Sequence, residues 1–217
     1  MSKPALEVID LGIAPYDLVY EKMREYTRTR DENTPDQFWL VEHPPVFTLG
    51  QAGDPSHLID QNTDIPVVKV DRGGQITYHG PGQVVVYLML DLKRNGYFVR
   101  DLVNRMEQAI IDTLADFDVD GQRQAGAPGI YLGPEGLKDP RLVGAKIAAL
   151  GLKVSRHCCY HGLALNVDMD LVPFEAINPC GYAGLNTIEL ASLGILTSKQ
   201  VVASKLVNHL KQSLKLA

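Results

Sequence analysis

One uninterrupted apolar stretch limits what this chain can fold into. Residues 84–90, VVVYLML, form a run of seven apolar residues that Asp91 closes. A run of this length is far shorter than the ~20 residues needed to cross a bilayer. Its β-branched continuity favours a strand that is buried on both faces. We therefore expect a central strand over residues 84–92, inside a covered sheet.

The remaining patterns predict short strands and three amphipathic helices. Apolar residues recur at helical spacing over residues 15–28 and 99–117, and a capping-box pattern at 197–200 opens a C-terminal helix. Strand patterns fall at residues 5–11, 38–41, 46–49, 67–70, 129–132, 142–149, 152–155 and 160–167. Because strands and helices do not alternate regularly, we expect one mixed-sheet α/β or α+β domain over residues 1–217.

Charge and cysteine content exclude several classes of protein. There are 21 Lys and Arg against 26 Asp and Glu, a net charge of −5, which argues against a nucleic-acid binder. The first residues show no apolar signal segment. An odd number of cysteines, three, with two of them adjacent, favours free thiols in a reducing cytoplasm.

The first candidate for chemistry is the glycine-rich segment RGGQITYHGPGQ at residues 72–83. Its glycines allow a ligand to approach the backbone closely. It matches neither a nucleotide P-loop nor a dinucleotide fingerprint, because an apolar strand follows it instead of a helix. A tight hairpin is the alternative. Arg72 and His79 favour a binding wall for an acyl or carboxyl group.

The second candidate is a cysteine that could act as a nucleophile. Cys180 lies between Pro179 and Gly181, a loop setting rather than a core one. A partner base is needed, and Lys146 stands alone in the small, apolar segment VGAKIAALG. Burial favours the neutral amine of a lysine, which can take a proton from a thiol. A structural cysteine and an outward-pointing surface lysine are the alternatives.

The third candidate, HCCYH at residues 157–161, could be mistaken for a metal site. In an extended strand, His157, Cys159 and His161 would point one way and Cys158 and Tyr160 the other. That leaves three ligands without a fourth, and the spacing of structural zinc sites is missing. We therefore favour a packed strand end and expect no metal. His161 begins HGLALNV, a small-residue stretch that could line a pocket beside the glycine-rich segment.

Four motifs in order, RGGQITYHGPGQ, GAKIAALGLKV, HGLALNV and INPCGYAG, resemble those of lipoyl(octanoyl) transferases, and EHPPVFTLGQAG at residues 42–53 extends the likeness. The resemblance implies the fold of the biotin and lipoate protein ligases. It also implies an acyltransferase of lipoate biosynthesis that needs no cofactor. Such an enzyme moves an octanoyl group from octanoyl-acyl carrier protein to a specific lysine of a lipoyl domain, through a thioester on a cysteine.

The resemblance also assigns roles to residues and suggests partners. It implies that Cys180 carries the acyl group and that Lys146 activates it. The acyl-binding segments fall on Arg72, Gly73, Gly74, Gln75, Ile76, Thr77, Tyr78, His79, Ala149, Leu150, Gly151, Gly162, Leu163 and Ala164. Leu165 is expected to be one of the apolar residues that line the pocket for the acyl chain. Implied acceptors are the lipoyl domains of 2-oxoacid dehydrogenase acyltransferase subunits and the glycine cleavage H protein. We expect a cytoplasmic monomer that binds neither nucleic acid nor membrane.

Two other functions stay open. An ATP-dependent lipoate or biotin ligase would share the fold, but it activates its acid as an adenylate and needs no cysteine nucleophile. A non-catalytic binding module would tolerate the glycines, but it gives no reason for Cys180 and Lys146 to stand among small residues.

Overall fold

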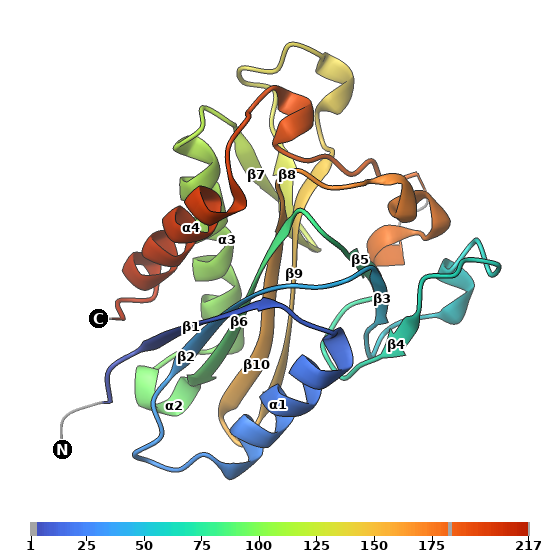
Figure 1. Ribbon diagram of the computed structural model, residues 1–217. Coiled ribbons are helices and arrows are strands. Elements are labelled where there is room, and N and C mark those ends of the chain that lie inside the picture. The colour runs from blue at the N-terminus through green and yellow to red at the C-terminus, as the bar shows by residue number, and fades with distance from the viewer. Residues whose placement is uncertain (1–3, 182–183, 217) are drawn as a thin grey trace.

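The computed structural model describes residues 4–181 and 184–216, and the side chain of Cys180 lies outside the described part. Its main feature is a mixed sheet of seven strands in the order β1-β2-β6-β10-β9-β8-β7 (Figure 1). Only β1 and β2 pair in parallel, and the other neighbours are antiparallel. The strands are β1 (Glu7–Ile13), β2 (Gln37–Glu42), β6 (Gln83–Asp91), β7 (Gly121–Gln124), β8 (Ala127–Leu132), β9 (Lys146–Ser155) and β10 (Cys158–Asn166).

A second, smaller sheet packs beside the first. It contains β4, β3 and β5 in that order, with bounds Val46–Leu49 for β3, Val67–Lys69 for β4 and Ile76–His79 for β5. The helices are α1 (Tyr16–Thr29), α2 (Leu92–Asn95), α3 (Val99–Ala115) and α4 (Lys199–Ser213). Short 3-10 turns lie at η1 (Pro55–His57), η2 (Pro140–Leu142), η3 (Val172–Ala176), η4 (Pro179–Gly181) and η5 (Ala191–Leu193).

The long sheet is covered on both faces, as Figure 1 shows. Alternate residues of β6 point to opposite sides. Leu88 faces α3 and α4, where it shares a core with Met106 and Leu206. Tyr87 faces α1 and packs in a second core with Met23. The expected central strand, buried on both faces, is confirmed, although its neighbours are antiparallel.

Three local predictions are wrong. The glycine-rich segment 72–83, for which a loop was expected, contains the strand β5, and β5 with β6 is no hairpin because the two belong to different sheets. The strands expected at 142–149 and 152–155 are one strand, β9, because Gly151 continues the pairing with Gly162. The C-terminal helix is capped by Ser198, whose hydroxyl accepts the Val201 N–H, rather than by Thr197.

No helix in the described ranges is both long and apolar enough to cross a membrane.

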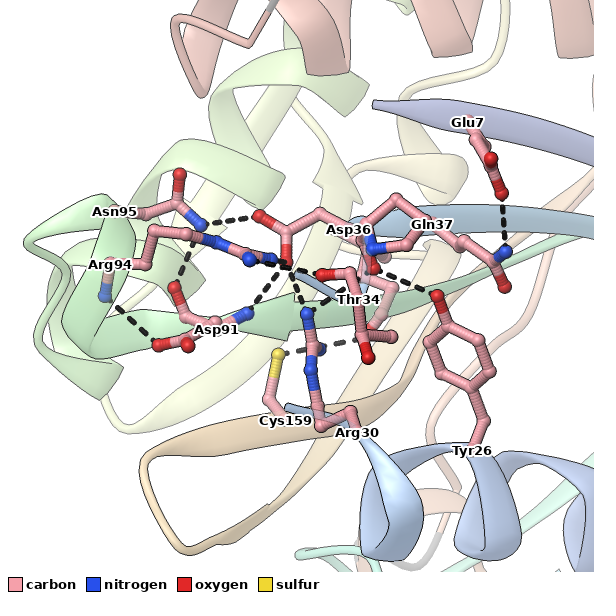
Figure 2. A network of polar contacts seen from close by, with 12 residues as sticks. Glu7, Tyr26, Arg30, Thr34, Asp36, Gln37, Asp91, Arg94, Asn95 and Cys159 are labelled. Carbon is pink, nitrogen blue, oxygen red and sulfur yellow. Dashed lines mark hydrogen bonds and ion pairs between the residues drawn. The ribbon is translucent and has the colours of Figure 1, made fainter. Parts of the chain in front are cut away.

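A buried ion-pair network ties the end of α1 to the start of β2 and the end of β6 (Figure 2). One oxygen of Asp36, Oδ1, accepts from Arg30 Nη2 and Arg94 Nη2, both at 2.7 Å, and from the Asp91 N–H at 2.8 Å. Oδ2 accepts from Asn95 at 2.6 Å. Burial opposes the ionised form, yet these hydrogen bonds lower the pKa of Asp36.

Candidate active site

A pocket lies between the long sheet, α1 and the glycine-rich segment. We call it the sheet pocket, and its empty volume is about 510 Å³ with solvent at its mouth included. Its lining comprises Tyr16, Arg72, Gly74, Gln75, Ile76, Thr77, His79, Val85, Tyr87, Ala149, Leu150, Gly151, His161, Gly162, Leu163 and Ala164.

Nearly all of the residues expected to bind an acyl group lie in this lining. Two do not. Gly73 donates its N–H to the Leu152 carbonyl at 2.9 Å. Tyr78 packs its ring against Phe47 and Phe174. Three separated segments of the sequence thus meet around one cavity.

Leu165, expected as a wall, is not part of the lining. It is fully buried in the core formed with α3 and α4. The expectation is wrong because strand alternation turns this side chain away from the α1 face, where Ala164 and Val85 lie.

Arg72 shapes the glycine-rich segment from within. Its Nη2 donates to the Thr48 carbonyl at 2.7 Å and to the Thr48 hydroxyl at 2.8 Å, and its Nη1 donates to the Gly73 carbonyl at 3.0 Å. A side chain at Gly50 would meet the Gly74 carbonyl oxygen at 2.3 Å. The loop is therefore held tightly against β3 beside the sheet pocket.

Tyr16, His79 and Tyr87 are buried residues of the lining, and His43 contacts Tyr87. His79 Nδ1 lies 2.7 Å from Gln83 Oε1, and His43 Nε2 lies 2.8 Å from the Tyr87 hydroxyl. Burial lowers the pKa of His79 to about 3 and that of His43 to about 4, so both rings are neutral at pH 7. Tyr16 stacks on His79 at a centroid distance of 5.8 Å.

His161 lines the sheet pocket as expected, but its side chain does not follow strand alternation. Its φ of 63° is left-handed, and this turns the ring to the face of Tyr160, on which it stacks at 5.0 Å. His161 Nε2 lies 3.1 Å from Asp71 Oδ1, and the Tyr160 hydroxyl also donates to Asp71. Partial burial alone would raise the pKa of Asp71, yet these hydrogen bonds lower it overall.

Lys146 begins β9 and lies inside the protein, at 4% exposure. The surface alternative for this lysine is therefore wrong. Its Nζ donates to the Pro128 carbonyl at 2.9 Å and to the Tyr131 hydroxyl at 3.2 Å. It lines a small cavity, which we call the lysine pocket, together with Thr77, Gln83, Ala148, Ala149, Asn166, Phe174, Pro179 and Thr187. The two pockets share Thr77 and Ala149 and are therefore adjacent.

The backbone of Cys180 belongs to the turn η4, and its side chain lies outside the described residues. Asn178 N–H donates to the His57 carbonyl at 2.8 Å, which fixes this turn against η1. Gly181 has a φ of 79°, and a side chain there would meet His57 and Gln75 within 3.4 Å. Pro179 lines the lysine pocket, and Cys180 is the next residue. The backbone of Cys180 therefore lies next to that cavity.

The other two cysteines are buried in β10 as free thiols. Burial raises the pKa of Cys159 to about 12, and its Sγ donates to the Leu88 carbonyl. His157 precedes the strand in a left-handed turn with a φ of 63°. Among the residues that the structure describes, no three or more His, Cys, Asp or Glu side chains are arranged to hold a metal ion.

The Lipoyl protein ligase A/B catalytic domain model matches residues 18–214 of the chain. Fold and site together thus define a member of that class of catalytic domains, and the expected α/β fold is confirmed. An octanoyltransferase of Paraburkholderia xenovorans is 62% identical over 88% of this chain and 79% of its own length. One of Polynucleobacter asymbioticus is 55% identical over 94% and 95%. The chain belongs to the octanoyltransferase family, and it is an acyltransferase.

Solved structures share the fold at low sequence identity. A bipartite lipoate protein ligase from Thermoplasma acidophilum superposes with a TM-score of 0.73 at 13% identity, over 100% of this chain and 86% of the other. A biotin protein ligase from Aquifex aeolicus gives 0.55 at 11%, over 99% and 70%. Identities this low bear on the fold alone.

Proposed function

We propose that the protein transfers an octanoyl group from octanoyl-acyl carrier protein to a specific lysine of a lipoyl domain. In this proposal Cys180 carries the acyl group as a thioester and Lys146 acts as the base. The observation that carries it is the adjacency of two cavities: Lys146 and Pro179 line the lysine pocket, which shares Thr77 and Ala149 with the sheet pocket. An acyl chain in the sheet pocket would end beside the turn of Cys180.

The chemistry needs two acyl exchanges. In the first, the amine of Lys146 takes the thiol proton of Cys180. The sulfur then attacks the donor thioester, a new C–S bond forms and the carrier thiol leaves with a proton. In the second, the acceptor lysine amine attacks the Cys180 thioester, forms the amide and returns the thiol. Covalent catalysis divides the transfer into steps that need no ATP.

The groups around Lys146 Nζ could accept hydrogen bonds from the proton that it takes from Cys180. The Pro128 carbonyl and the Tyr131 hydroxyl lie within hydrogen-bond distance of Nζ and would stabilise the ammonium that forms. The Tyr131 ring centroid lies 5.1 Å from Nζ, a cation–π distance. These contacts support a role for Lys146 in proton transfer.

The sheet pocket suits an alkyl chain. Ile76, Val85, Leu150 and Leu163 are apolar residues of its lining. Each buried methylene contributes about 0.8 kcal/mol, so the tail would supply much of the affinity.

The acceptors proposed are lipoyl domains of 2-oxoacid dehydrogenase acyltransferase subunits and the glycine cleavage H protein. We further propose a monomer whose 217 residues form a single catalytic domain. The free thiols of Cys158 and Cys159 support a cytoplasmic location, where thiols stay reduced.

The experiment is an intact-mass measurement after incubation with octanoyl-acyl carrier protein, without ATP. Wild type should gain one octanoyl group and Cys180→Ala none, while Cys158→Ala, the matched thiol control, should load like wild type. Lys146→Ala should load slowly and recover partly at alkaline pH, where a free thiol ionises with a pKa of ~8.5. An equally abundant adduct on Cys180→Ala would contradict the proposal.

An ATP-dependent ligase is the competing function, favoured by the shared fold alone. It predicts that free octanoate and ATP modify a lipoyl domain at the wild-type rate in Cys180→Ala. Transfer from the carrier thioester without ATP would rule this function out as the main activity.

A further inference from the structure

The peptide group between Pro128 and Gly129 is bound from both sides. Its carbonyl oxygen, on Pro128, accepts a hydrogen bond from Lys146 Nζ at 2.9 Å. Its N–H, on Gly129, donates to Glu107 Oε1 at 3.1 Å. One peptide group therefore joins a carboxylate on α3 to Nζ of Lys146 on β9.

The Lys146 side chain runs directly against this peptide. Gly129 has a φ of 133°, and a side chain there would lie 2.6 Å from Lys146 Cε and 2.8 Å from Nζ. A glycine is therefore required at this position, because any other residue would displace the lysine or strain the backbone. The orientation of the peptide therefore contributes to where Nζ lies, together with the Tyr131 contacts.

Glu107 is an unusual residue for the middle of a helix that packs on a sheet. It is 5% exposed, and the flanking buried residues of α3 are apolar. Arg123 on β7 donates to its other oxygen, Oε2, at 3.1 Å. A buried carboxylate is tolerated when it is paired and hydrogen-bonded, and both oxygens of Glu107 have partners.

We propose that Glu107 is a positioning residue for Lys146, acting through the Pro128–Gly129 peptide. The carboxylate orients the N–H, which turns the carbonyl toward Nζ. Hydrogen bonds in such a chain polarise one another and strengthen together. This inference rests on the proposed role of Lys146 as the base, but the contacts that carry it do not involve Cys180.

Two substitutions separate positioning from structural support. Glu107→Gln keeps an oxygen that can accept the Gly129 N–H, and Glu107→Met keeps the volume but has no such acceptor. Misplacing a catalytic group by about 1 Å can cost a factor of about 100. We expect kcat for acyl loading to fall about 10- to 100-fold in Glu107→Met, with an unchanged KM for the donor, and Glu107→Gln to keep most of the wild-type kcat. Asp112→Asn, a carboxylate-to-amide change on the same helix, is the matched control and should behave like wild type.

Hydrogen exchange at the Gly129 amide measures the hydrogen bond between Gly129 and Glu107 independently of activity. Exchange should be slow in wild type and Glu107→Gln and fast in Glu107→Met. A folded Glu107→Met with wild-type kcat, or with a protected Gly129 amide, would overturn the proposal. Failure of the proposed function looks different: wild type itself would form no adduct, whereas the exchange pattern would persist.

Discussion

Replacing Asp36 with asparagine should destabilise the protein strongly without touching the site. Asn is nearly isosteric and can keep part of the hydrogen bonding, but it removes the negative charge between Arg30 and Arg94. Those side chains are 3% and 15% exposed. Two buried cations would then face each other without their counter-charge.

The magnitude follows from this burial. Removing one partner of a buried ion pair costs about 3–5 kcal/mol. For a chain of this size each kcal/mol lowers Tm by about 2–4 °C, so we expect a fall of about 6–20 °C. Arg30 Nε and Nη1 already have no hydrogen-bond partner in the described part of the chain, which leaves little with which to compensate.

The assay is equilibrium urea unfolding, with thermal unfolding as a second probe. Asp139→Asn is the control, because Asp139 pairs with Arg141, whose side chain is 89% exposed. Such a surface pair is worth about 0–1 kcal/mol. Octanoyl transfer at low temperature should be unchanged in both variants. A loss below about 1 kcal/mol in Asp36→Asn would refute the reasoning.

Three further outcomes can be checked on the same protein. The pKa values of His43 and His79, about 4 and about 3, lie below the ~6.5 of an unfolded histidine. Their contribution to stability is therefore complete above pH ~6.5 and is lost as pH falls toward these values; a Tm that does not change between pH 7 and pH 4 would contradict this. In Gly162→Ala the added carbon would lie 2.0 Å from the Val86 carbonyl oxygen, so we expect a loss of at least about 1–3 kcal/mol, and a urea midpoint equal to that of wild type would show that the backbone can yield. Cys159, whose pKa burial raises to about 12, should resist iodoacetamide until the protein unfolds; peptide mapping decides this, and rapid labelling in the native state would count against it.

Periodicity predicted the parts of the fold that carry their own pattern. The apolar run of β6 and the helical stripes of α3 and α4 each identify an element from residues close in sequence. The small sheet was not predicted as such, since β3, β4 and β5 are three or four residues long and pair over long separations. The strand β7, GQRQ, has no apolar alternation and was missed.

The residues of the candidate site were likewise predicted only in part. Glycine content and the resemblance predicted the lining at 72–79, 149–151 and 162–164, with Gly73 and Tyr78 as exceptions. Tyr16, Val85 and Tyr87 were missed because their periodicity is that of ordinary core residues. The orientation of His161 depends on one left-handed φ, which alternation cannot reveal. Glu107 gives no signal in sequence, because its partner Gly129 becomes a neighbour only in the fold.

The sheet pocket draws its walls from α1, the glycine-rich segment, β6, β9 and β10. Because these elements are far apart in the sequence, a ligand inside the pocket binds only a chain in which α1, the glycine-rich segment and the long sheet have come together. At 100 times its dissociation constant such a ligand adds about 2.7 kcal/mol to the free energy of unfolding. Where proteases remove unfolded chains, an acyl group bound there as proposed would lengthen the life of each copy of the enzyme, and a shortage of acyl donor would reduce its abundance as well as its turnover.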